Sequence, residues 1–306
     1  MTAPATATLL LPEPRRFAGQ PLPMPLAKAL GRADRLPDGK AGERAQLLRH
    51  FELLPRGWPV AALTRQRDAG DAAQDAWLRA DPAYVRPDIN GVRLLGLGEA
   101  LQPAQADVDA LLPALRPLFG DAGFALDAPV PSRWYLRLPR GATLPAFVGP
   151  DDALGDDLFE HLPDGPEGRR WRALLSEAQV LLHNHPRNAE RAAAGLPPIN
   201  SLWFWGAGVL PDHVRSSCTH VRTNDPLLAA LAHAAGIRGD MPGEGDVLVD
   251  YRALATFDDA FLGWIASAVA GQLPRLVLDF ADGARWKIHR AQRWRFWRRP
   301  AQHLPT

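Results

Sequence analysis

The sequence predicts an α+β protein with an α/β middle portion, in which a mixed sheet carries flanking helices and a β-hairpin closes the chain. Short extended segments alternate with helical periods between residues 77 and 182, as expected where sheet and helix mix. A strand, a capping residue and a helix follow one another within residues 219–236, which is typical of α/β structure. Residues 276–280 and 285–289 flank the turn pair Asp282-Gly283, which predicts the closing hairpin.

The first 76 residues are expected to pack on the main domain. Residues 1–8 are expected to form a loose tail, and Leu9-Leu10-Leu11 a short strand. Residues 43–54 place four large apolar side chains at helical spacing, which predicts one helix with a single buried stripe. These side chains are Leu47, Leu48, Phe51 and Leu54.

The region from residue 77 to residue 168 is predicted to start as a β-hairpin. Asn90-Gly91 separates two extended segments, and Asn-Gly is a strong hairpin signal. Residues 103–119 have a helical period that contains Pro113 and Pro117, so we expect a kinked helix or two short ones. The remaining predictions are strands at 77–79, 84–86, 92–95, 124–126 and 133–138, and a long loop or link at 139–168.

Helices and strands alternate in the rest of the chain. Residues 171–184 have one apolar helical face, a short helix is expected to start at Pro186, and an aromatic strand follows at 203–205. Asn224 or Asp225 is expected to cap the next helix, with Pro226 in its first turn. Further predictions are a buried strand at 219–222, mixed strand and turn at 246–254, and a helix at 257–269.

Composition places the 306-residue chain in the ordinary globular class, with 46% hydrophobic and 23% charged residues. Cys218 is the one cysteine, which excludes an intrachain disulfide and a thiolate metal cluster. We expect it to be a small buried thiol and not a nucleophile, because no His-Asp relay lies near it in the sequence. The sequence has neither a signal-peptide pattern at its start nor an apolar run of membrane-spanning length, so we expect a cytoplasmic protein without membrane contact.

The segment from His185 to Gly208 is the candidate ligand site. Asn188 and Arg191 share a face of the expected short helix, and Arg187 lies four residues before Arg191, so a phosphate or carboxylate could be met by two cationic groups. The candidate set is His185, Asn188, Arg191, Asn200, Trp205, Gly206 and Gly208, with Gly206-Ala207-Gly208 expected to form a turn that offers free N–H groups. The structural alternative is that the amides tie down loop backbone, Arg191 pairs with a local acid, and the tryptophans are core.

The same segment has the pattern H-P-x-N-x-x-R-x-x-x-G-x-P-x-x-N-x-x-W-x-W-G-x-G. This pattern resembles archaeal-type cofactor-independent phosphoglycerate mutases, and still more the bacterial regulatory proteins of RpfE type. The likeness to the mutases is confined to the middle of the chain, whereas the likeness to RpfE-type proteins extends from Trp77 to about Gly236 and again over residues 294–299. We therefore expect three parts: an N-terminal segment (1–76), a mutase-like middle (77–240) and a C-terminal helix, hairpin and basic tail (241–306). The alternative is that the three parts form one continuous domain.

The mutases that the pattern resembles need Asp and His ligands for two divalent ions and a Ser nucleophile. No Asp-Gly follows the expected first strand, and His220, His233, His289 and His303 lack matching Asp residues, so we identify no catalytic residue and no metal ligand. We also interpret His183-x-His185 and Asp212-His213 as non-metal sites, since a third ligand is absent at a recognisable spacing. No cofactor is expected, and Mn²⁺ or Mg²⁺ enters only if the chain is an enzyme.

These observations favour a non-catalytic regulatory or ligand-binding protein of RpfE type that takes a small anion, with a protein partner as a further possibility. The first alternative is a metal-dependent phosphotransferase of the phosphoglycerate mutase type. The second is nucleic-acid binding through the basic C-terminal run, by Arg293, Arg295, Arg298 and Arg299 with the neighbouring tryptophans. The plainer interpretation of that run is a final hairpin whose tryptophans pack and whose arginines are solvated.

Overall fold

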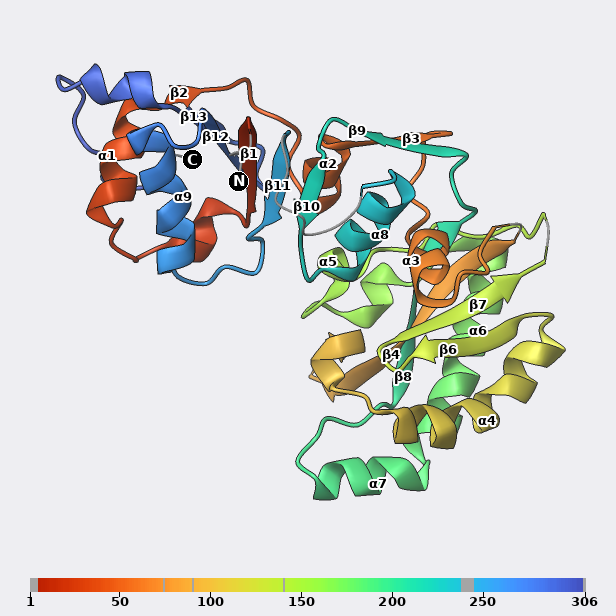
Figure 1. The fold of residues 1–306 in the computed structure, drawn as a ribbon. Helices are drawn as coiled ribbons and strands as arrows, with labels where there is room; N and C mark the ends of the chain where they lie inside the picture. Colours follow the sequence, from red (N-terminus) through yellow and green to blue (C-terminus); the bar gives the residue numbers. More distant parts are fainter. Residues whose placement is uncertain (1–4, 74, 90, 140, 238–244, 305–306) are drawn as a thin grey trace. The chain divides into compact units, whose positions relative to one another are not determined.

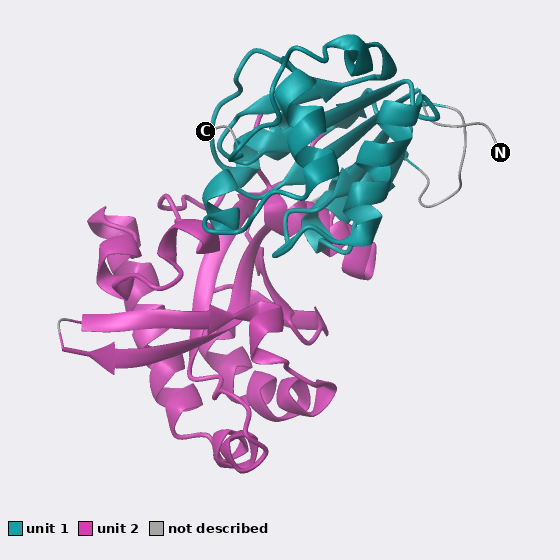
Figure 2. Cartoon of the chain, turned by 90° about the vertical axis from the view of Figure 1, so that its left-hand side faces the viewer, with its two compact units in different colours: residues 1–55, 212–306 teal, residues 56–211 magenta. Residues whose placement is uncertain are grey.

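The computed structural model describes residues 5–73, 75–89, 91–139, 141–237 and 245–304. These residues form two compact units, one made of residues 1–55 and 212–306 (unit 1) and one made of residues 56–211 (unit 2), coloured separately in Figure 2. Unit 2 is therefore an insertion in the sequence of unit 1. The boundaries expected from the sequence lie at 76/77 and 240/241, away from those of the two units. No helix of the described residues is long and apolar enough to cross a bilayer.

Unit 1 is built on a six-stranded sheet in the order β10-β11-β1-β12-β13-β2. The first four strands are parallel, and β13 and β2 are antiparallel to their neighbours. Leu9, Leu10 and Leu11 of β1 have no exposed surface, because a central parallel strand is covered on both faces. The bounds are β1 Thr6–Leu11, β2 Asp34–Arg35, β10 His220–Arg222, β11 Val247–Asp250, β12 Arg275–Phe280 and β13 Arg285–Ile288.

The helices of unit 1 bury one apolar face each. Leu26 and Leu30 of α1 pack in one core with Phe261 and Ile265 of α9. Asp225 caps α8 by accepting a hydrogen bond from Leu228 N at 2.7 Å, which confirms the predicted cap. The bounds are 3₁₀ helices η1 Pro14–Phe17 and η4 Arg290–Trp294 and α-helices α1 Met24–Arg32, α2 Glu43–Leu48, α8 Pro226–Ala234 and α9 Asp259–Ala270.

The single helix predicted over residues 43–54 is wrong in its second half. Helix α2 ends at Leu48, and Phe51–Leu54 form β3, which pairs antiparallel with β9 (His213–Ser216). Phe51 and Leu53 are buried and alternate with the more exposed Glu52 and Leu54, which is the period of a strand and not of a helix. The predicted loose tail is also too long, since β1 starts at Thr6.

Unit 2 is a five-stranded antiparallel sheet around the long strand β4, which pairs with β5, β7 and β8 (Figure 1). Trp77 and Leu78 are neighbours in β4 and belong to different apolar clusters, as expected for the two faces of a strand. Helices α4 and α6 bury Leu115 and Trp171 on the Leu78 face, and α3 packs against β4 and β8 through alanines of the Trp77 cluster. The strands are β4 Ala76–Asp88, β5 Gly91–Leu97, β6 Ala125–Val130, β7 Arg133–Leu138 and β8 Ser201–Gly208.

The helices and the first hairpin of unit 2 can be compared with the remaining predictions. Residues 105–121 form one helix with Pro113 and Pro117 inside it, so the alternative of two short helices is wrong. The hairpin β4–β5 is confirmed, although Asn90 of its predicted turn lies outside the described residues. The bounds are α3 Val60–Ala69, α4 Gln105–Asp121, α5 Pro150–Ala153, α6 Gly165–His183, α7 Pro186–Ala193, η2 Gly98–Leu101 and η3 Leu158–His161.

The predicted fold class is confirmed: the chain mixes helices with parallel and antiparallel sheet and has the β12–β13 hairpin in its C-terminal part. The strand, cap and helix at 219–236 do form an α/β arrangement, because β10 joins the parallel part of a sheet. That sheet belongs to unit 1, whereas the middle of the chain is antiparallel. Sequence order and spatial grouping therefore differ, since unit 2 interrupts unit 1.

Gly206 and Gly208 lie at the end of β8 and not in a separate turn. A Cβ atom on Gly206 would lie 2.8 Å from the Cβ of Val60, and one on Gly208 would lie 2.6 Å from the Cβ of Pro59. Gly206 also has a φ of +67°, which side chains rarely adopt. Both glycines therefore let β8 approach the start of α3 closely.

We expect Gly206→Ala to destabilise unit 2 by about 2–4 kcal/mol, from the positive φ together with the overlap on Val60. Gly195→Ala is the matched control, because Gly195 has a φ of +73° and open space around its Cβ position, and it should cost only about 1–2 kcal/mol. Urea unfolding followed by tryptophan fluorescence measures both. Equal losses for the two variants would show that close approach at β8 is not what requires glycine.

Candidate functional site

The predicted signature segment forms α7 and β8 in unit 2, with Asn188 at its centre. The Asn188 side-chain amide donates to the carbonyl oxygens of Leu182 and Ile199 at 2.8 and 2.9 Å, and its oxygen accepts from Ile199 N at 2.8 Å. Asn188 is buried and so has both ends of its amide paired. It thereby fastens the end of α6 to the chain that enters β8.

Arg191 and Arg187 do share one face of α7, as the spacing predicts, and together they meet a carboxylate. That carboxylate is Asp107 of α4: Arg191 Nη1 lies 2.6 Å from Oδ2, and Arg187 Nε lies 2.7 Å from Oδ1. Arg191 also donates to the carbonyl oxygens of Leu101 and Pro197 and is only 1% exposed. The anion that the two arginines hold in the structure is therefore part of the protein.

Asp107 remains charged in this environment. Burial by itself favours the neutral acid, but the backbone N–H of Ala104, the hydrogen bond from Arg187 and the positive charge of Arg191 hold the pKa of Asp107 below its ordinary value. Asp107 links the start of α4 to α7. Two elements about 80 residues apart in sequence are joined by this one carboxylate.

The other predicted ligand residues also have partners within unit 2. His185 caps α7, with Nδ1 accepting from Arg187 N at 3.2 Å. The Asn200 amide makes two hydrogen bonds to the backbone of Val85, at 2.9 and 2.8 Å. Trp205 donates its indole N–H to Asp81 at 2.7 Å. The structure thus gives each a structural contact, and binding of an external anion by this set stays a prediction.

The partner of Trp205 belongs to a buried ion pair that the sequence analysis did not single out. Arg79 donates to both carboxylate oxygens of Asp81 at 2.8 Å, and Asp81 is 1% exposed. Burial raises the pKa of Asp81, while the guanidinium of Arg79 and the indole of Trp205 act in the opposite direction. The alternation Arg79-Ala80-Asp81 in a strand puts both charged side chains on one face, which is the signal that could have identified the pair.

Asn200 is the predicted residue that faces a cavity. This cavity, of about 720 Å³, lies beside α6 and the β4–β5 hairpin of unit 2. Its polar lining includes Arg172, Gln179, His183 and Asn184, with an apolar remainder around Leu158 and Leu162. The size falls within the range of small-molecule sites.

In unit 1, charged residues collect where the parallel strands end. The carboxylate of Asp250, the last residue of β11, accepts from Arg252 Nε and Nη2 at 2.9 and 2.8 Å and from Thr223 Oγ1 at 2.7 Å. Arg252 also lies 3.1 Å from Asp225 and 3.3 Å from Glu43. Burial favours neutral Asp250, yet the Arg252 hydrogen bonds and charge hold its pKa below the ordinary value.

A second buried carboxylate lies near the end of β12. Asp279 has no exposed surface and meets Arg49 Nη2 at 2.5 Å and His50 Nε2 at 2.9 Å. Against the effect of burial, these two groups lower the pKa of Asp279. Gln46 of α2 donates to the carbonyl oxygens of Leu11 and Asp279, so α2 is bound to the ends of β1 and β12.

Open parallel sheets bind ligands at the carboxyl ends of their strands, which makes this edge the second candidate site. Arg222 ends β10 there; it is exposed, stacks over Trp264 at 5.8 Å and forms no ion pair within the described chain. Sequence reasoning missed this edge because its residues come from four separate strands. The available signal is a charged residue at or near the end of three of these strands, namely Arg222 in β10, Asp250 in β11 and Asp279 in β12.

The described residues do not fit a metal pair. They contain no group of three or more His, Cys, Asp or Glu side chains that could hold a metal ion. At the sheet edge the carboxylates of Asp250 and Asp279 already face guanidinium groups. Cys218 is buried, and burial raises the pKa of its thiol, so the thiolate needed by a nucleophile is disfavoured.

The basic C-terminal run differs from its plainer interpretation. Trp294, Phe296 and Trp297 are 65–77% exposed, so these aromatic side chains do not pack as core. Arg295 instead is half-buried and donates to Asp34 and to the carbonyl of Arg32 at 2.5 and 2.8 Å. Arg293, Arg298 and Arg299 are exposed. Nucleic-acid binding by this segment stays a prediction.

We expect Arg191→Met to destabilise unit 2 by about 3–5 kcal/mol, because Asp107 would stay buried with one of its cations removed. Arg169→Met is the matched control, since Arg169 is exposed on α6. Urea unfolding at neutral pH measures both variants. A loss below about 1 kcal/mol for Arg191→Met would contradict a structural role for the Asp107 pair.

The Asp107 pair also predicts a pH dependence. A carboxyl whose folded pKa is depressed stabilises the folded state above its ordinary pKa, and this stabilisation is lost as the pH falls through the lower folded value. The difference between wild type and Arg191→Met should therefore be constant above pH about 5 and shrink below pH about 4. Unfolding series in urea from neutral to acid pH test this, and a difference that grows on acidification would contradict it.

Comparison with known proteins relates the chain to phosphoglycerate mutases. It is 28% identical over 153 residues to a probable 2,3-bisphosphoglycerate-independent phosphoglycerate mutase of Geobacter sulfurreducens, 31% over 126 residues to such a mutase of Methanothrix thermoacetophila, and 39% over 121 residues to that of Methanosarcina barkeri. The matches cover 50%, 39% and 39% of this chain but only 38%, 30% and 29% of the relatives. The chain matches no family model.

Solved structures give a looser likeness. A cofactor-independent phosphoglycerate mutase from Thermoplasma acidophilum matches 94% of this chain and 90% of its own at 15% identity and a TM-score of 0.41. A protein of Pyrococcus horikoshii matches 94% of this chain and 88% of its own at 12% identity and a TM-score of 0.46. In sequence, the chain is homologous over part of its length to 2,3-bisphosphoglycerate-independent phosphoglycerate mutases, and these relatives do not support the resemblance to RpfE-type proteins.

Proposed function

We propose that the chain acts on a phosphoglycerate or a closely related phosphorylated acid, as a phosphotransferase of the phosphoglycerate mutase type. The observation that carries this proposal is the partial sequence homology to mutases, at 28–39% identity over 121–153 residues. The chain spans less than two fifths of these relatives in each match, so their activity enters here as a proposal.

The sheet edge of unit 1 is where we place the proposed anion site. Arg222 ends a parallel strand at that edge, and its guanidinium forms no ion pair with a carboxylate of the described residues. Arginine can hold a phosphate through two parallel hydrogen bonds, which fixes the orientation of the phosphoryl group as well as its position. Thr223 and the buried Asp250–Arg252 pair follow at the same edge and would keep the surrounding loops in place.

The divalent ions implied by the mutase resemblance find no matching donor set among the described residues. A metal pair when bound would neutralise charge on the transferring phosphoryl group. The edge instead carries guanidinium groups beside its carboxylates, so we derive no step through a metal.

The same donor set favours a second candidate, a regulatory protein that binds a phosphorylated acid without turning it over. In this case Arg222 would bind the ligand's phosphate as before, and no nucleophile or metal would be required. Both candidates predict binding of phosphoglycerate, and only the first predicts turnover.

We expect the folded chain to interconvert 2- and 3-phosphoglycerate, measured by ³¹P NMR with Mn²⁺, with Mg²⁺ and with EDTA. Arg222→Gln should raise KM about tenfold, which is the loss expected for one charge-assisted contact. Arg215→Gln, which removes the same charge from an exposed position on β9, should leave KM unchanged.

Thermal unfolding with 3-phosphoglycerate separates the two candidates. A ligand at a hundred times its Kd adds about 2.7 kcal/mol to the free energy of unfolding. A shift that Arg222→Gln abolishes, without turnover under any metal condition, would replace the phosphotransferase by the binding protein. Neither turnover nor a shift would overturn both.

A further inference from the structure

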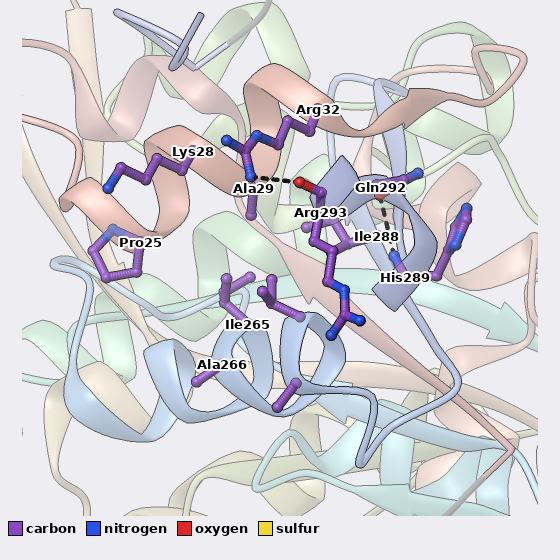
Figure 3. Close-up of a pocket in the computed structure, with 12 residues that line it drawn as sticks. Pro25, Lys28, Ala29, Arg32, Ile265, Ala266, Ile288, His289, Gln292 and Arg293 are labelled. Atoms are coloured by element: carbon purple, nitrogen blue, oxygen red, sulfur yellow. Dashed lines mark hydrogen bonds between the residues drawn. The ribbon is translucent and has the colours of Figure 1, made fainter. Parts of the chain in front are cut away.

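A separate cavity lies in unit 1 between α1, α9, β13 and η4 (Figure 3). Its volume is about 370 Å³, at the lower end of the range seen for small-molecule sites. Of the residues in the candidate sites described above, Arg293 of the basic C-terminal run lines it, and the residues of the signature segment and of the sheet edge do not. The cavity is bounded by α1 and α9, which pack on each other, and by β13 of the sheet.

The inner part of this cavity is apolar. Ala29 of α1, Ile265 of α9 and Ile288 of β13 are buried and belong to the core of unit 1. Ala266 and Val269 continue the apolar lining along α9, and Val269 is 38% exposed. A hydrocarbon group placed there would lie on the buried Ile265 and Ile288 and cover Ala266 and Val269, which now face water, and this burial is favourable.

The outer part of the cavity is cationic. Lys28 and Arg32 come from α1, and Arg293 extends from η4 toward α9 (Figure 3). Within the described part of the chain, none of these three side chains forms an ion pair with a carboxylate. The lining contains no Asp or Glu. His289 also lines the cavity, but Asp34 lies 3.6 Å from its ring.

This lack of acidic partners sets the cavity apart from the other basic clusters of the chain. Asp34 is shared by Lys287, His289 and Arg295, and Arg252 faces Asp225 and Asp250. Cations beside an apolar surface and without internal counter-ions attract an anion from outside. An anion with an apolar body satisfies both parts of the lining at once.

We propose that this cavity binds a monomeric amphipathic anion, with a hydrocarbon chain along Ala266 and Val269 of α9 and a carboxylate or phosphate at Lys28, Arg32 and Arg293. The site goes beyond the proposed phosphoglycerate function, because a phosphoglycerate has no apolar body to fill the inner part. The same headgroup chemistry occurs on anionic membranes, and a cavity of about 370 Å³ has room for a single free molecule.

Straight-chain carboxylates from hexanoate to dodecanoate, titrated by calorimetry below their aggregation concentrations, test the apolar part. Each added methylene should tighten binding about fourfold until the cavity is full, which corresponds to about 0.8 kcal/mol per buried methylene. Decanol, of the same length as decanoate but uncharged, should bind at least about fivefold more weakly. Equal affinity for decanol and decanoate, or no dependence on chain length, would overturn the proposal.

A charge variant tests the cationic part. Lys28→Gln combined with Arg293→Gln should weaken decanoate binding about fivefold or more. Lys40→Gln combined with Arg67→Gln, which removes the same charges from exposed positions outside the lining, should not. The far-ultraviolet circular dichroism and melting temperature of both variants check that they fold. Equal affinities for the two double variants would contradict the assignment.

Vesicles separate the free ligand from a membrane surface. Sedimentation with vesicles of phosphatidylglycerol and phosphatidylcholine should show no retention that depends on Lys28 and Arg293. Retention lost in that double variant, together with no binding of monomeric decanoate, would overturn the monomer site in favour of a membrane contact.

Discussion

A carboxylate that is buried away from water needs a positively charged side chain beside it, and this requirement determines much of the internal arrangement of each unit. Asp279 has no exposed surface, so the turn after α2 has to bring Arg49 and His50 to it. That turn ends the helix and starts β3 at the residue needed to pair with β9. In unit 2, Asp107 plays the same part for α4 and α7. The positions of short elements follow from these ion pairs as much as from apolar packing.

Local chemistry could be read from the sequence wherever the signal and the structure lie within one element. The apolar period of α6, the Asp225 cap and the face shared by Arg187 and Arg191 are of this kind. What the spacing of Arg187 and Arg191 could not provide was the identity of their anion, because Asp107 lies about 80 residues away. The same limit applies to β3, where Phe51 and Leu54 have helical spacing but Phe51 and Leu53 have strand spacing, and pairing with β9 decides for the strand.

The sequence did not predict which strands lie together in one sheet, and this was the larger gap. The parallel sheet collects β1 from the start of the chain and β10, β11 and β12 from its last third, with unit 2 between them. Non-local pairing of this kind leaves no periodic signal at either end. The sheet edge that we propose as the anion site is built from those separate strand ends, so its residues appear unrelated in the sequence.

Guanidinium groups at the sheet edge bear directly on the choice between the two proposed functions. A guanidinium carries one positive charge at any accessible pH and presents its N–H donors in one fixed plane. A divalent metal ion carries two positive charges and binds ligands from several directions. Arg252 gives its donors to Asp250 and lies near Asp225 and Glu43, so those carboxylates are already neutralised. Arg222 has no such partner among the residues that the structure describes, and it can still receive a phosphate. Recognition of a phosphorylated acid therefore needs only residues that the edge presents, while transfer needs a nucleophile and an electrostatic partner beyond Arg222. The homology argues for transfer and the edge argues for recognition, and turnover by the folded chain decides between them.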